Sequence, residues 1–123
     1  MSNLQYGLPA KPAGTDLDRD ILVTEDDGTY IVVSGPTVEP AGLLDHSASE
    51  GDEVSPKRGI ADYVRTSEDI EAGDLLMPAA DGEVAVYDDT SAGNVCIGRA
   101  GSDADNGDLV RVEFAAIYEI ATE

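Results

Sequence analysis

Two Asp-Gly pairs, each set between apolar runs, constrain the fold of this chain more than any other feature. The stretch "ILVTEDDGTYIVVSG" places Asp27-Gly28 between runs rich in β-branched residues, and "DLLMPAADGEVAVYDD" repeats the arrangement around Asp81-Gly82. Asp and Gly tolerate the positive φ of a tight type I′ turn, so both stretches predict β-hairpins. Thirteen glycines and six prolines in 123 residues add further turns, which favours short strands over long helices.

A second signal is the phrase Gly-Asp-Leu, which occurs at residues 73–75 and again at residues 107–109. Each copy precedes an apolar run. In "LVRVEF" the residues Val110, Val112 and Phe114 alternate with charged neighbours, as a half-buried strand requires. We interpret the two phrases as turns that start two strands of one barrel and not as ligand sites.

These patterns predict an all-β protein with seven or eight short antiparallel strands, arranged as a small β-barrel or sandwich. Residues 21–123 form the single β domain, and residues 1–20 form an extended N-terminal arm, in which Leu4, Tyr6 and Leu8 alternate between breakers. Residues 36–59 read as a long loop with, at most, a short helical turn around Leu43 and Leu44. An arm of this kind either becomes ordered against a partner or is a frayed terminus.

The charge is strongly acidic: 26 Asp and Glu face 7 Lys and Arg, which gives a formal net charge of −19. Such a surface repels itself in dilute buffer, whereas at about 1 M salt the Debye length falls to roughly 3 Å and screens the repulsion. The composition therefore predicts adaptation to a very salty medium. The alternative is an acidic protein that docks on a basic partner. Nucleic-acid binding is not expected, because no basic patch is present to neutralise phosphates.

Enzymatic chemistry is poorly supported. Asp45, His46 and Ser47 are adjacent in sequence and so point in different directions, whereas a catalytic triad converges from separate elements. Cys96 is the single cysteine, and we interpret it as a buried thiol. One His and one Cys cannot fill a zinc shell, and no glycine-rich phosphate loop occurs. We expect no enzyme activity and no cofactor, although a carboxylate pair for glycoside hydrolysis remains open.

Two acidic stretches are candidates for cation binding. Asp16, Asp18 and Asp20 have the spacing that begins a calcium loop, but the sixth position is Ile21 and the twelfth is Asp27. The second stretch holds Asp103, Asp105 and Asp108 and lacks a bidentate Glu at the right distance. We expect no specific metal site and, instead, loosely held hydrated cations. No apolar segment reaches the length of a membrane span, and no signal-peptide pattern is found at the start.

Residues 67–114 resemble the head decoration proteins, or capsid cement proteins, of tailed double-stranded DNA viruses. The resemblance rests on Ala-Gly-Asp before a strand, the hairpin that follows, the "VCIGRA" strand and the second Gly-Asp; residues 75–100 resemble the lambda-type decoration protein. Ala-Gly-Asp also occurs before a strand in lipoyl-like and carbohydrate-binding domains. A lipoyl-like carrier is disfavoured, because the hairpin "AADGEV" carries no lysine.

The resemblance implies a β-tulip-like barrel that assembles as a homotrimer on the outer surface of an icosahedral capsid. It implies that the N-terminal arm pairs with the major capsid protein and that the protein cements neighbouring capsid subunits. With the acidic surface, it points to a virus of a halophilic, archaeal host. We expect Leu4, Tyr6, Leu8 and Pro9 to contact the capsid, and Tyr63, Met77 and Tyr87 to lie at the subunit interface. The alternatives are ordinary core packing for these residues and, for the chain, a stand-alone carbohydrate-binding or cell-surface module.

Overall fold

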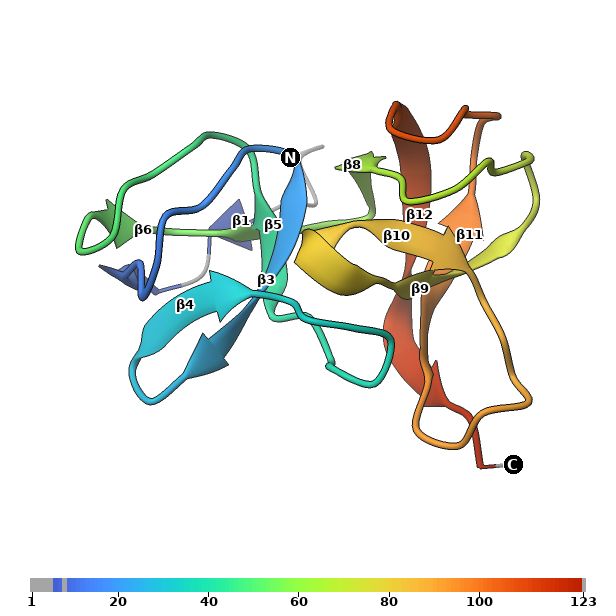
Figure 1. Cartoon of the computed structure of the whole chain (residues 1–123), viewed down its shortest axis with the longest axis horizontal. Helices are drawn as coiled ribbons and strands as arrows, with labels where there is room; N and C mark the ends of the chain where they lie inside the picture. The colour runs from blue at the N-terminus through green and yellow to red at the C-terminus, as the bar shows by residue number, and fades with distance from the viewer. Residues whose placement is uncertain (1–5, 8, 123) are drawn as a thin grey trace.

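The structure is a computed structural model that describes residues 6–7 and 9–122. Nearly all of its regular structure is β-strand, which confirms the all-β prediction (Figure 1). The strands of the first half of the chain gather on one side of the molecule and those of the second half on the other. The two predicted hairpins are present, and their turns use positive φ at Asp27 and Gly28 and at Asp81 and Gly82.

The first half contributes a five-stranded sheet of order β1-β7-β5-β3-β4 and a two-stranded sheet of β2 and β6. The strands are β1 (Tyr6–Gly7), β2 (Lys11–Pro12), β3 (Ile21–Asp26), β4 (Thr29–Val32), β5 (Gly42–Leu44), β6 (Glu53–Val54) and β7 (Lys57–Arg58). A parallel bridge between Ala13 and Tyr30 joins the chain after β2 to β4. The strands of this half therefore close into a small barrel.

The second half forms a five-stranded sheet of order β10-β9-β11-β12-β8. Its elements are β8 (Ala61–Arg65), β9 (Leu75–Pro78), the 3-10 turn η1 (Ala80–Gly82), β10 (Val84–Val86), β11 (Val95–Ala100) and β12 (Leu109–Ile120). A parallel bridge between Thr66 and Val84 joins the end of β8 to β10. This bridge closes the second sheet into a barrel as well.

The two barrels repeat one pattern of strand pairing, register for register. The pairs β3–β4, β3–β5 and β2–β6 of the first barrel correspond to β9–β10, β9–β11 and β8–β12 of the second. Leu22 opposite Leu43 corresponds to Leu75 opposite Arg99. In the same way, the pairing of Leu43 with Lys57 corresponds to that of Arg99 with Glu113. The chain is thus an internal structural duplication, which the sequence analysis did not detect.

The most regular part of the duplication is a nine-residue crossed loop, which occurs four times, at residues 13–21, 44–52, 66–74 and 100–108. The loops pair two by two through antiparallel bridges between their fifth residues, Leu17 with Ala48 and Ile70 with Ala104. In each loop the eighth residue has positive φ and donates its N–H to the carbonyl of the first residue of the partner loop. These residues and acceptors are Asp20 to Leu44, Gly51 to Ala13, Gly73 to Ala100 and Gly107 to Thr66. The predicted turns at Gly73-Asp74 and Gly107-Asp108 are two of these loops.

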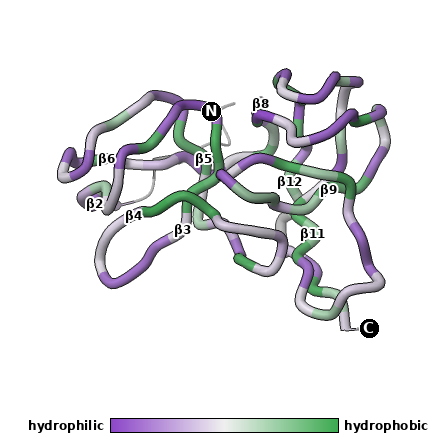
Figure 2. Tube along the Cα trace, viewed as in Figure 1, coloured by the Kyte–Doolittle hydropathy of each residue, from purple (hydrophilic) through white to green (hydrophobic). Residues whose placement is uncertain are grey.

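Each barrel has its own core. The core of the first contains Ala13, Leu17, Val23, Tyr30, Leu44 and Val54. The larger core of the second is joined by three side chains of the first barrel, Leu22, Val33 and Leu43. In β3 the consecutive residues Ile21, Leu22 and Val23 are therefore all buried, because neither face of the strand meets water. In Figure 2 the hydrophobic stretches follow the strands where the two barrels meet.

Two segments differ from the sequence-based expectation. Residues 36–59, expected to be a loop with at most a helical turn around Leu43 and Leu44, contain three strands: both leucines are buried in β5, and β6 and β7 follow. In the segment predicted as an arm, β2 pairs with β6, and Leu17 is only 3% exposed. Residues 11–20 therefore form the first strand and first crossed loop of a barrel.

Candidate interaction surfaces

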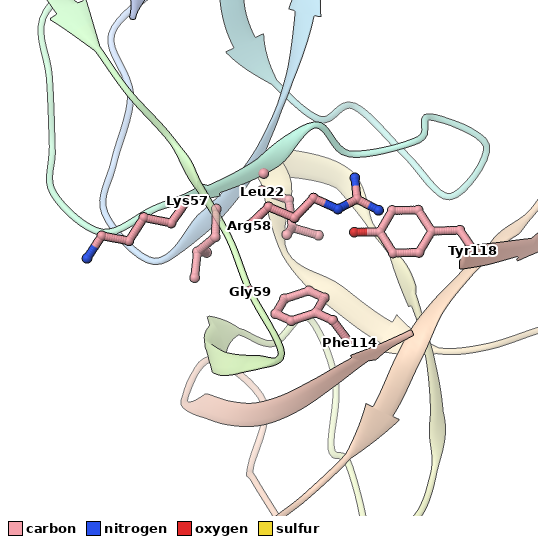
Figure 3. Close-up of a pocket in the computed structure, with 8 residues that line it drawn as sticks. Leu22, Lys57, Arg58, Gly59, Phe114 and Tyr118 are labelled. Atoms are coloured by element: carbon pink, nitrogen blue, oxygen red, sulfur yellow. The ribbon is translucent and has the colours of Figure 1, made fainter. Parts of the chain in front are cut away.

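The outer face of the first barrel is covered by the second barrel. Leu22, Val33 and Leu43 project from this face and are 1%, 0% and 3% exposed. Phe114 and Tyr118, from β12 of the second barrel, lie over it (Figure 3). The cavity that remains between the two barrels measures about 10 Å³, which is no more than a single water molecule occupies. This face is a filled packing contact and offers no room for a ligand.

An arginine–tyrosine contact closes the edge of this packing. The guanidinium of Arg58 lies 4.4 Å from the centre of the Tyr118 ring, and Figure 3 shows the two side chains side by side. Burial raises the pKa of the Tyr118 hydroxyl, while the charge of Arg58 opposes that rise. The neighbouring Lys57 points away and pairs with Asp45 at 2.6 Å. A cation–π contact between Arg58 and Tyr118 thus helps to hold β12 against the first barrel.

The same face of the second barrel is open. By register, Leu22 and Leu43 correspond to Leu75 and Arg99, and Leu75 is 41% exposed. Val33 corresponds to Tyr87, because their N–H groups donate to the carbonyls of Leu22 and Leu75. A groove of about 450 Å³ lies here across β9, β11 and β12. Its lining residues are Leu75, Cys96, Gly98, Arg99, Glu113, Ala115 and Glu119. One barrel therefore has this face filled by aromatic side chains, and the other presents it to solvent.

The groove combines an apolar floor with a charged rim. Gly98 lies in the floor. A Cβ there would lie 2.2 Å from the carbonyl oxygen of Glu113, so a glycine lets β11 and β12 approach closely. On the rim, Arg99 donates to the Gly73 carbonyl at 2.8 Å, and Glu113 lies 3.7 Å from Arg111. The rim also carries Glu119, so the groove suits an apolar or aromatic side chain accompanied by a basic one.

Two of the three predicted interface residues, Met77 and Tyr87, lie near Leu75 of this groove but are not among its lining residues. Met77 lies on the same face of β9 as Leu75, and the Tyr87 N–H donates to the Leu75 carbonyl at 2.8 Å. Partial burial, with Cys96 and acids that include Glu119 nearby, raises the pKa of the Tyr87 hydroxyl. Whether Met77 and Tyr87 contact another subunit stays a prediction.

The third predicted interface residue, Tyr63, lies on β8 and is not among the groove residues. It is 47% exposed and pairs with Arg111 of β12. Leu109, two residues before Arg111 on the same outer face, is 43% exposed. The neighbouring Ile60 is 55% exposed. We call Tyr63, Leu109 and Arg111 the β8 patch. The sequence analysis identified Tyr63 but not its neighbours, whose exposure depends on which strands pair.

The predicted capsid-contact residues are only partly described. Leu4 and Leu8 lie outside the described residues. The backbone of Tyr6 pairs with Arg58 in the first sheet, and the carbonyl of Pro9 accepts a hydrogen bond from the Tyr30 hydroxyl at 2.8 Å. Burial, the largest effect, raises the pKa of that hydroxyl.

The acidic stretches mostly serve the crossed loops. Asp16 accepts the Glu50 N–H at 2.9 Å, and Asp103 accepts the Ala72 N–H at 2.8 Å. A hollow of about 300 Å³ is lined by Asp16, Asp18, Ile21, Val32, Arg65, Asp81 and Glu83. Burial and then the nearby Asp81 raise the pKa of Glu83. Within the described part of the chain, no three His, Cys, Asp or Glu side chains gather as metal ligands would.

Of the residues considered for catalysis, Asp45 and His46 form local contacts at the surface and Cys96 is buried. His46 Nδ1 is 2.9 Å from Asp45 Oδ1, but that carboxylate is shared with Lys57. Hydrogen bonds from Lys57 and then from His46 lower the pKa of Asp45 to about 2. Cys96 is 7% exposed at the floor of the groove, in agreement with its interpretation as a buried thiol. No helix in the described residues is long and apolar enough to cross a membrane.

Comparison with known proteins gives a likeness among solved structures. No family model matches the chain, and no curated protein matches it. Among solved structures, the fold is similar to one titled "The crystal structure of head fiber gp8.5 N base in bacteriophage phi29", with a TM-score of 0.72. The likeness covers 91% of this chain and 95% of that chain at 19% identity. It shows that the two share a fold, across both barrels.

Proposed function

We propose that this protein is a structural component of the head of a tailed double-stranded DNA virus, bound to the outer surface of the capsid. The observation that carries the proposal is the fold, which a phage head-fibre base shares over nearly the full length of both chains. The resemblance of residues 67–114 to head decoration proteins, which rests on different evidence, supports the same role. In this role the protein is non-enzymatic and part of the virion.

The mechanism that we propose is cementing of neighbouring major capsid protein subunits. The N-terminal residues Leu4, Tyr6, Leu8 and Pro9 provide the capsid contact, with strand pairing from the arm. A protein that binds only the expanded shell stabilises that shell by linkage, and icosahedral symmetry repeats the effect over many sites. The acidic surface suits a virus of a halophilic archaeon, and a homotrimer is the assembly that the decoration-protein resemblance implies.

A second candidate is the base of a head appendage, and the name of the structural neighbour favours it. A cement protein occupies many junctions and strengthens the shell, whereas an appendage base anchors a separate part. Both roles require binding to the capsid. The two differ in whether the shell becomes more resistant to heat when the protein binds.

Capsid binding and shell stability test these roles together. Expanded empty capsids of the parent virus, stripped of this protein, are mixed with the purified chain in molar salt and sedimented. We expect co-sedimentation, a higher melting temperature of the shell, and loss of both when Leu4, Tyr6 and Leu8 are changed to Ser. Binding without a change in shell melting supports the appendage base. A chain that stays in the supernatant at micromolar concentration contradicts the proposed function and favours a stand-alone binding module.

A further inference from the structure

The two barrels place equivalent faces in opposite situations. In the first barrel, Leu22 is 1% exposed because Phe114 and Tyr118 of the second barrel cover it. In the second barrel, the corresponding Leu75 is 41% exposed at the floor of a groove of about 450 Å³. Within the described chain, the filled face shows what such a surface accepts: aromatic side chains from a neighbouring strand, one of them stacked on an arginine.

The β8 patch of the same barrel offers a matching surface. Tyr63 and Leu109 are 47% and 43% exposed on its outer side, and Arg111 pairs directly with Tyr63, two residues beyond Leu109 on β12. Large apolar side chains exposed side by side at this level are typical of interaction sites. Glu113 on the groove rim already lies 3.7 Å from Arg111 of the same copy, so Glu119 is the rim acid that complements the arginine of another copy's patch. The patch therefore has the aromatic and basic character that the groove accepts.

We propose that the open groove of the second barrel binds the β8 patch of a second copy of this chain, so that copies associate head to tail. The groove is lined by β9, β11 and the part of β12 from Glu113 onwards, whereas the patch lies on β8 and the start of β12, so the two adjoin but share no residue. Because these are different surfaces, the interface is heterologous, and repetition of the contact gives a ring if the rotation closes. The contact places Tyr63 of one copy near Leu75, Met77 and Tyr87 of the next.

Charge sets the condition under which this association is measurable. Each copy carries a net charge of −19, so copies repel one another in dilute buffer. Screening at about 1 M salt removes most of that long-range repulsion and leaves the burial of the apolar side chains. Association through the groove should therefore increase with salt concentration, in contrast to an interface held mainly by surface ion pairs.

A mixture of two variants, one with its groove blocked and the other with its patch blocked, tests the proposal. Leu75→Arg fills the groove, Tyr63→Glu places an acid on the patch, and both positions are exposed enough to tolerate the change. In molar sodium chloride, we expect sedimentation velocity to give a concentration-dependent mass above 12.8 kDa for the unmodified chain and a monomer for each variant alone. An equimolar mixture should form dimers and nothing larger, because one intact groove and one intact patch remain.

The controls separate loss of contact from loss of fold. Val86→Ser removes an exposed apolar side chain outside both surfaces, 36% exposed, and should associate like the unmodified chain. Leu75→Ser gives a milder groove variant, and circular dichroism confirms folding of each protein. An unmodified chain that stays monomeric at high concentration overturns the proposal, as do single variants that assemble normally or a mixture without dimers. Capsid co-sedimentation is scored separately, so failure of the proposed function is recognised independently of this result.

Discussion

At the scale of single residues, many aspartates act as hydrogen-bond acceptors for the backbone. Asp52 and Asp74 accept the N–H of the residue three positions earlier, and Asp69 accepts the Asn106 N–H across the paired loops, all within 3.0 Å. An acceptor at a turn satisfies an N–H that no strand partner reaches. The acidity of this chain therefore has a local structural function in addition to its effect on solvation.

Asp45 gives the clearest prediction at this scale, since Lys57 and His46 lower its pKa to about 2. A carboxyl whose folded pKa lies below its unfolded value of roughly 3.9 contributes stability above that value and loses it as the pH falls towards 2. We expect unmodified protein to be more stable than Asp45→Asn at pH 5 and equal to it near pH 2. Because the pair is exposed to solvent, we expect a difference below about 1 kcal/mol.

Urea unfolding at a series of pH values measures this difference. Lys57→Met removes the partner at 2.6 Å and should abolish most of the same pH dependence, and the double variant should add little to either single one. Parallel pH profiles for the unmodified protein and Asp45→Asn between pH 5 and 2 would show that the pair contributes nothing to folding.

At the scale of elements, the crossed loop explains where glycine is required. Its eighth residue is Gly51, Gly73 or Gly107 in three loops, with φ between 91° and 94°, and Asp20 with φ 64° in the fourth. A Cβ at the three glycines would meet nothing within 4 Å, so steric contact does not select glycine there. The left-handed backbone conformation does, because it disfavours residues with a Cβ.

This difference predicts that substitutions at Gly73 and at Asp20 change the stability of the protein in opposite directions. Gly73→Ala should destabilise the protein by about 1 kcal/mol, and Asp20→Gly should stabilise it by up to about 1 kcal/mol, since glycine relieves the left-handed strain. The ion pair from Arg19 that Asp20 loses is exposed and contributes little. Gly35→Ala, in open space and without positive φ, serves as the matched control. Chemical denaturation gives the three values, and a destabilising Asp20→Gly would contradict the equivalence of the four loops.

The same loops show what could be predicted from the sequence. The Asp-Gly hairpins and the two Gly-Asp-Leu turns were predictable, because each contains the residues that its backbone conformation demands. A third Gly-Asp, in "SEGDEV", precedes the two-residue strand β6, and at the fourth loop Asp20 replaces the glycine. Strands as short as β2 and β7 carry no period, so the segments on either side of the predicted hairpin at residues 21–35 read as an arm and a loop.

The groove could not be predicted, because its exposure depends on how the two barrels pack against each other. Leu22 and Leu75 occupy the same register position on β3 and β9, and each adjoins an apolar run. One is covered by a neighbouring barrel and the other is not. Only the packing of the two barrels distinguishes them. A sequence signal exists for the repeated loop, since "AGTDL" at residues 13–17 and "AGSDA" at residues 100–104 are the first five residues of two of the four loops.

At the scale of the whole molecule, repulsion between the acidic side chains opposes the stabilisation that the two small cores provide. The two barrels have separate cores, built mainly from aliphatic side chains, with Tyr30 among those of the first. A net charge of −19 on 123 residues adds repulsion that the compact state must overcome. The balance therefore depends on the ionic strength of the medium, which is the physical content of the proposed adaptation to salt.

We expect the thermal midpoint of unfolding to fall by several degrees as sodium chloride is lowered from about 1 M to about 0.1 M, because the Debye length lengthens to roughly 10 Å. Substitution of the exposed Asp26, Asp27 and Asp89 by Asn changes the net charge from −19 to −16 and should reduce this dependence. Calorimetry at one fixed protein concentration keeps self-association from contributing. Sucrose separates screening from solvent exclusion, since it should stabilise both proteins equally. A midpoint that does not change with salt would remove the basis for a halophilic host while leaving the fold and the groove unaffected.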